Sequence, residues 1–174
     1  MISIAVSDQR TFTLPADLAT TTAYFRDFER TIRDLHHLRM VKTYAPDQYR
    51  ILYSAAEGGI YHVAFYCDIQ VQFDEISPAI RVLPLAGIPP VSPKVTINSM
   101  TGQGYYASQS IFQPVGPNTN VKYEVEIQAE VPKRLELRLI PDQVAKQVIE
   151  KLVKQRLQAI TDAFIERTME GIHQ

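Results

Sequence analysis

Residues 141–172 read PDQVAKQVIEKLVKQRLQAITDAFIERTMEGI, and no residue before Gly171 interrupts a helix within them. Apolar residues recur through this stretch at the spacing of an amphipathic helix. The chain before it reads mostly as strands, apart from one short region. Because an amphipathic helix must bury its apolar face against another element, we expect this helix to lie on a sheet and to cover the inner face of that sheet.

The composition is that of an ordinary globular domain. The chain has 174 residues, 45% of them hydrophobic and 21% charged, with a formal net charge of −1. A basic excess is usual in nucleic-acid-binding proteins, so that class is disfavoured. Apolar runs are shorter than the ~18–20 residues of a membrane span, and the N-terminus lacks the pattern of a secretory signal. We expect one domain, residues 1–174, in the cytoplasm.

Alternation of apolar and polar residues predicts the sheet. It is clearest in residues 61–73 and 121–131, and this period is typical of antiparallel strands with one solvated face. Residues 15–38 change to helical spacing, with Asp17 as a candidate N-cap and a joint near residues 27–29. The predicted class is α+β: an antiparallel sheet of about seven strands, with two short helices after the first strand and a long C-terminal helix.

Two segments leave alternatives open. Residues 132–140, PKRLELRLI, alternate like a strand, but Pro132 and Pro141 bracket them closely, so a turn that leads into the helix fits equally well. Residues 86–93, AGIPPVSP, form an apolar, proline-rich loop. This loop is either a lid over a cavity or a rigid connection between strands, and its apolar residues could also contact a partner protein.

The order of elements resembles the START-like superfamily, also called SRPBCC, which includes pathogenesis-related plant allergens, polyketide cyclases and lipid-transfer domains. Local similarity lies in FTLPADLATTTAYFRD, residues 12–27, and in AEVPKRLELRLIPDQV, residues 129–144, followed by KQRLQAITDAF, residues 154–164. The latter pair is similar to a branch with cyanobacterial and plastid members and no established reaction. The resemblance implies a helix-grip fold, in which a curved sheet wraps round the last helix, and a cavity between the two. It supplies no catalytic residues.

One glycine pattern matches a cofactor motif only formally. Gly102, Gly104 and Ala107 fit the degenerate dinucleotide fingerprint GxGxxA. That chemistry needs a helix after the glycines, whose N-terminus meets the pyrophosphate. Strand-like residues, YYASQSIF, follow here instead. The pattern therefore predicts a hairpin turn, and we expect no cofactor.

The histidines and the single cysteine also have simple explanations. His36 and His37 are adjacent, so in a helix they would point about 100° apart and would not converge on a metal ion. Cys67 falls on the inward face of its predicted strand, whereas His62 falls on the outward face. A nucleophilic thiol needs a nearby base and a lowered pKa, so we expect an inert core thiol and no metal site.

An arginine falls on the predicted apolar face of the last helix. With ~100° per residue, the arc that holds Ala145, Ile149, Leu152 and Ile160 is centred near Arg156. An unpaired buried charge is very costly. Arg156 is therefore either an anchor for an anionic ligand group, or one half of an ion pair with an acidic residue on a strand, or a side chain whose stem carries the charge to the sheet edge.

Inward tyrosines suggest a cavity that is apolar but holds a few hydrogen-bonding groups. Tyr53 and Tyr123 fall on predicted inner faces, and one of Tyr105 and Tyr106 must point inward because they are consecutive. Core packing alone explains most tyrosines of this kind. A ligand pocket is the alternative explanation.

We therefore expect a binding module for a small hydrophobic or amphipathic ligand, such as a lipid, pigment or isoprenoid. A cyclase- or hydrolase-like enzyme that uses the same cavity, and a regulatory or scaffolding protein, are the alternatives. The sequence offers no convincing acid–base pair for an enzyme. The expected cavity residues are Tyr53, Phe65, Cys67, Tyr105, Tyr123, Ile149, Leu152, Arg156 and Ile160.

Overall fold

The computed structural model describes residues 1–33, 35, 37–57, 59–133 and 139–173. Within these ranges the chain forms one strand, two short helices, seven further strands and one long helix. The bounds are β1 Ile2–Leu14, α1 Leu18–Arg26, α2 Phe28–Arg33, β2 Leu38–Ala45, β3 Gln48–Glu57, β4 Tyr61–Asp74, β5 Ala79–Pro84, β6 Lys94–Val95, β7 Ser99–Val115, β8 Asn118–Val131 and α3 Asp142–Gly171.

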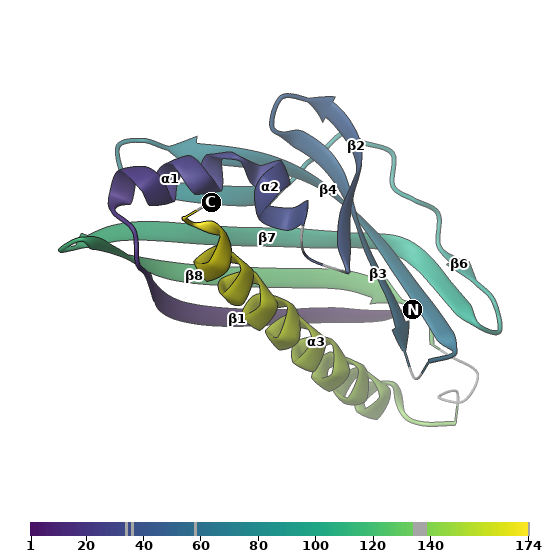
Figure 1. Ribbon diagram of the computed structural model, residues 1–174. Helices are drawn as coiled ribbons and strands as arrows, with labels where there is room; N and C mark the ends of the chain where they lie inside the picture. The colour runs from purple at the N-terminus through teal and green to yellow at the C-terminus, as the bar shows by residue number, and fades with distance from the viewer. Residues whose placement is uncertain (34, 36, 58, 134–138, 174) are drawn as a thin grey trace.

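The strands form one curved sheet in the order β1-β8-β7-β5-β4-β3-β2, with β6 paired to β7. Neighbouring strands are antiparallel with one exception. Beyond the end of β5, residues 62–66 of β4 pair in parallel with residues 99–103 of β7. Helix α3 lies against one face of this sheet, with α1 and α2 near its C-terminal end (Figure 1). The predicted α+β helix-grip arrangement is confirmed.

Side-chain caps fix the two short helices. Asp17 Oδ1 accepts a hydrogen bond from the backbone N–H of Thr20 at 2.8 Å, so Asp17 is the N-cap of α1 as predicted. Asp27 Oδ1 accepts from the N–H of Arg30 at 3.0 Å, at the start of α2. The chain therefore changes direction at the joint that the sequence indicated.

The hydrophobic core has two clusters that meet under α3. The larger one lies below α1, α2 and the C-terminal half of α3, and includes Phe25, Phe112 and Phe164. The smaller one surrounds Ala145, in the N-terminal half of α3. Val153 packs against both clusters, so the middle of α3 lies over the boundary between them.

The buried face of α3 differs from the predicted one by roughly 90°. Leu157, Phe164 and Thr168 are buried, whereas Leu152 is 60% exposed. Thr161 and Thr168 donate their hydroxyl groups to backbone carbonyls four residues earlier, at 2.9 and 2.8 Å. Threonines whose hydroxyl groups are hydrogen-bonded in this way can be buried like apolar residues. A sequence pattern that counts them as polar therefore predicts the wrong buried face for the helix.

The glycine pattern at residues 102–107 does not form a turn, so that prediction was wrong. Gly102 and Gly104 lie inside the long strand β7, at inward-facing positions next to β4. A Cβ atom on Gly104 would stand 3.1 Å from Cys67 Sγ. Glycine inside a strand marks such a close approach.

Two predictions fall outside the described residues. Part of the segment 132–140 lies outside them, and so does His36.

Candidate functional site

The inner face of the sheet has a floor without side chains, beside the N-terminal half of α3. The open part of this floor is Gly102, whose register partner is Phe65, because the Cys67 and Phe65 side chains already fill the space over Gly104. A Cβ atom on Gly102 would meet only the Phe65 ring among the described residues, at 3.7 Å. Phe65 and Ile149 point into the core yet are only partly buried. Both apolar side chains therefore keep part of their surface exposed.

An ion pair joins the middle of α3 to the last residue of β3. Arg156 Nε and Nη2 donate to Glu57 Oε1 and Oε2, at 3.0 and 2.8 Å. Arg156 therefore has the strand carboxylate as its partner, which was one of the simpler interpretations. The two side chains are 41% and 40% exposed. The hydrogen bonds from Arg156 hold the pKa of Glu57 below its usual value, and the same bonds raise the pKa of Arg156.

Tyr53 lies on the inner face of β3, near this ion pair. Burial raises its pKa, and the nearby carboxylate of Glu57 raises it further. Its hydroxyl oxygen is buried and has no hydrogen-bond partner within the described part of the chain. The His37 ring lies 6.2 Å from the Tyr53 ring. A buried hydroxyl without a partner is costly, and a polar group of a bound molecule would remove that cost.

A second polar group lies further along the inner face, under the C-terminal half of α3. The hydroxyl oxygens of Tyr106 and Tyr123 are 3.0 Å apart, and the Tyr123 ring packs against Phe164. Burial raises the pKa of both tyrosines, so both stay neutral. Of the consecutive pair, Tyr106 points inward and Tyr105 outward, which corrects the choice of Tyr105 as a cavity residue.

Asp8 is an inward-facing acid that the sequence interpretation missed. Its side chain is 7% exposed, and Oδ1 accepts a hydrogen bond from Arg10 Nη1 at 2.8 Å. Its other oxygen, Oδ2, is buried without a partner among the residues that the structure describes. A signal existed, because Asp8 and Arg10 share the parity of Val6 and Phe12 on β1, and all four point to the same face.

The structure brings the predicted cavity residues together only in part. Tyr53, Phe65 and Ile149 lie around the glycine floor, with Arg156 at its edge beside Glu57. Leu152 and Tyr105 are exposed to solvent. The remaining three take other positions: Ile160 is partly buried, Tyr123 lies under Phe164, and Cys67 lies behind Gly104.

Cys67 has the properties of an inert thiol. It is buried, and burial raises the pKa of the thiol to about 12. A nucleophilic cysteine requires the opposite shift. His62, the histidine nearest in sequence, is exposed on the other face of β4. The prediction that Cys67 faces the core is confirmed.

The outer face of the sheet holds a buried polar network. Arg50 of β3 donates from Nε and Nη2 to both oxygens of Asp68 on β4, at 2.7 and 2.8 Å. Tyr44 Oη and Gln103 Nε2 donate to the same carboxylate, at 2.8 and 3.2 Å. Burial alone would raise the pKa of Asp68, but these hydrogen bonds together hold it below its usual value. Asp68 is therefore a charged group that is 4% exposed and fully paired.

The proline-rich loop, residues 86–93, and Leu85 before it lie on this network and not over the inner face. The contacts of this segment are Leu85 N–H to Asp68 O at 2.8 Å, Arg50 Nη2 to Pro89 O at 3.1 Å, and Val91 N–H to Gln103 Oε1 at 3.0 Å. The interpretation as a rigid connection fits these contacts. A lid over the inner face does not fit them.

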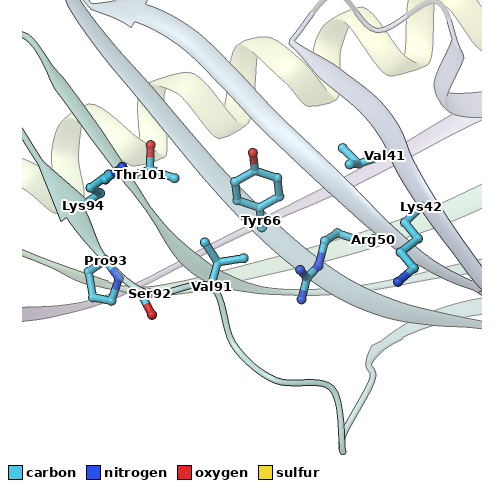
Figure 2. A pocket seen from close by; sticks show the side chains of 9 residues that line it. All are labelled: Val41, Lys42, Arg50, Tyr66, Val91, Ser92, Pro93, Lys94 and Thr101. Atoms are coloured by element: carbon cyan, nitrogen blue, oxygen red, sulfur yellow. The ribbon is translucent and has the colours of Figure 1, made fainter.

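Two pockets flank the loop on the outer face. One has a volume of about 690 Å³ and is lined by nine residues whose side chains lie on the side of the sheet away from α3 (Figure 2). The other has a volume of about 190 Å³ and lies between the loop, Asp68 and Gln103. Neither pocket could be predicted from the sequence, because both depend on where the loop folds back.

Two classes of site are not seen in the described residues. They contain no cluster of three or more His, Cys, Asp or Glu side chains that could hold a metal ion. In the same residues, no helix is both long and apolar enough to cross a membrane.

Comparisons with known proteins identify the fold. A comparison with protein-family models gives no match, and a comparison with curated protein sequences gives none either. Several solved structures are similar. A START superfamily protein from Mycobacterium smegmatis has 14% sequence identity and a TM-score of 0.54, over 95% of this chain and 98% of that one.

Two of the similar structures are named for enzymes. The Zhui aromatase/cyclase of a Streptomyces species has 12% identity and a TM-score of 0.51, over 94% of this chain and 96% of that one. Truncated norcoclaurine synthase from Thalictrum flavum has 10% identity and a TM-score of 0.51, over 96% and 94%. Identities this low establish architecture only. The protein therefore has the fold of the START superfamily.

Proposed function

We propose that the chain is a single binding domain, in the cytoplasm, for a small hydrophobic or amphipathic molecule that lies between the inner face of the sheet and α3. The observation that carries this proposal is the glycine floor. Phe65 and Ile149 are apolar and point inward, yet they remain partly exposed beside a position where a Cβ atom would meet little. Apolar surface that is accessible inside a fold gains free energy when a ligand covers it.

The polar groups around this floor suggest how a ligand is oriented. The charge of Arg156 is already neutralised by Glu57, so an anionic group gains little from it. Tyr53 Oη, a hydroxyl near the floor, is buried without a partner in the described residues. A hydroxyl can both donate and accept, so a ligand with a hydroxyl group at one end satisfies it.

An enzyme remains the weaker alternative. Glu57 has a lowered pKa, and Tyr53 has a raised one. Both shifts move the pKa further from pH 7, whereas a general acid or base works best with a pKa near the operating pH. The names of the aromatase/cyclase and the synthase describe those proteins, and the described residues here favour binding.

The proposal is tested by placing a side chain at the glycine floor. Gly102 does not adopt a positive φ, so Gly102→Leu can be introduced without backbone strain. We expect this variant to lose compounds that co-purify with the wild-type protein, as detected by native mass spectrometry. Gln109→Leu, on the same strand but the opposite face, is the control and should keep them. Retention of the same compounds by a folded Gly102→Leu protein would contradict the proposal.

A further inference from the structure

The larger outer-face pocket is separate from the proposed inner site. Val41 of β2 and Tyr66 of β4 lie on one side of it, and Val91 and Pro93 of the loop lie on the other. Figure 2 shows these side chains in front of the strands, with α3 behind them. The sheet therefore separates the pocket from the glycine floor, and a molecule in one does not touch the other.

The wall of this pocket is held in place from several directions. Val91 is fixed through its backbone N–H to Gln103, and Lys94 follows in β6, which pairs with β7. Prolines at positions 89, 90 and 93 restrict the backbone between these points. On the sheet side, Arg50 is locked by its two bonds to Asp68. A pocket that exists before binding loses little conformational entropy when it is filled.

The charged residues of the lining are all positive. Lys42 and Lys94 lie towards opposite ends of the pocket, with Tyr66 between them (Figure 2). Neither lysine has a carboxylate within ion-pair distance in the described ranges, and no acid belongs to the lining. Arg50 uses Nε and Nη2 for Asp68, and its Nη1 makes no hydrogen bond with a described residue.

The lining therefore combines apolar surface with two lysine ammonium groups that have no carboxylate partner in the described residues, although Lys42 Nζ lies 5.1 Å from the centre of the Tyr44 ring. Val41 is 46% exposed, an apolar side chain that a bound molecule can cover. Ammonium and guanidinium groups form their strongest hydrogen bonds with carboxylate or phosphate oxygens. We propose that this pocket is a second binding site, for a small amphipathic anion that has an apolar body and one carboxylate or phosphate group. This second site does not depend on the function proposed for the inner face.

The probes for the test share one alkyl chain and differ in the head group: decanoate, decyl phosphate and decyltrimethylammonium. Each is titrated into the ¹⁵N-labelled full chain and followed by amide chemical shifts. We expect the two anions to shift the amides of Val41, Lys42 and Ser92, around the pocket, whereas the cation leaves them unchanged. The tighter anion identifies the preferred head group. A response confined to Ile149 and Val153 on α3, or an equal response to the cation, overturns the proposal.

Charge reversal tests the role of the lysines. Lys42→Glu combined with Lys94→Glu changes two exposed side chains and should lower the affinity for the anions at least about fivefold. Binding to the wild type should weaken when salt is raised from about 0.05 M to about 0.5 M. Lys151→Glu with Lys154→Glu makes the same change in net charge on the exposed side of α3. An equal loss in this control overturns the proposal, since overall charge would then explain it.

Discussion

Two arginine–carboxylate pairs in this protein have the same geometry and different surroundings. In both, Nε and Nη2 of the arginine meet the two oxygens of one carboxylate, at 2.7–3.0 Å. The Arg50–Asp68 pair is 18% and 4% exposed, and the Arg156–Glu57 pair is 41% and 40% exposed. Bond lengths alone would rank them as equals, but burial separates them, because water screens a half-exposed pair and not an enclosed one.

The difference indicates what each pair does. Arg50–Asp68 lies directly across the β3–β4 ladder and takes additional bonds from Tyr44 and Gln103, so it holds strands and loop together. Arg156–Glu57 crosses from the helix to a strand end, next to the proposed inner site. A solvated ion pair at that place can open at little cost. The first pair serves the fold, and the second is suited to a movable contact at the rim of the proposed inner site.

The largest effect is expected when the enclosed pair is broken. Asp68→Asn keeps the size of the side chain but leaves Arg50 without its counter-charge. We expect a loss of about 3 kcal/mol in the free energy of unfolding, measured by urea denaturation at pH 7. Asp162→Asn, at a carboxylate that is 61% exposed, is the matched control and should change little. A loss below about 1 kcal/mol for Asp68→Asn would show that water reaches the pair.

The same comparison predicts a pH dependence. The carboxyl of Asp68 has a lower pKa in the folded chain than in the unfolded chain, so the folded chain binds fewer protons. Its stabilisation is therefore complete above the unfolded pKa of about 4 and is lost as the pH falls through the lower folded value. The stability gap between wild type and Asp68→Asn should be constant from pH 7 to about pH 5 and should shrink towards pH 3.

Glu57→Gln provides the control for this pH experiment. The pKa of Glu57 is also lowered, so the direction is the same, but solvent screening makes its gap much smaller at every pH. A gap for Asp68→Asn that stays constant down to pH 3 would mean that the carboxyl is not more acidic in the folded chain.

The architecture could be predicted from sequence because it depends on local periods. Alternation in residues 61–73 and 121–131 and the long uninterrupted helix were sufficient for an antiparallel sheet with a helix on it. The face of α3 was not predictable in the same way. Thr161 and Thr168 bond to their own helix backbone, and a hydrophobicity pattern does not contain that information.

The site was less predictable because it depends on register and on the path of a loop. Parity placed Tyr53, Phe65 and Cys67 on the inner face correctly. Parity alone could not show that Asp68, on the outer face of β4, is buried, because its burial requires Arg50 opposite it and the loop above it. The outer pocket shares this origin, since Val91 and Lys94 reach Tyr66 only through that fold of the loop.

The smallest effect on stability is expected for the exposed pair, and it is informative because it should be small. Glu57→Gln and Arg156→Gln should each cost no more than about 1 kcal/mol, with a coupling of about 0.5 kcal/mol or less in a double-mutant cycle by urea denaturation. If the pair is a movable contact at the rim, both variants should also exchange the inner ligand faster while its affinity changes little, which stopped-flow displacement of a bound compound measures. A coupling near 3 kcal/mol would instead place Arg156–Glu57 with Arg50–Asp68 as a structural pair, and the distinction drawn from burial would then be wrong.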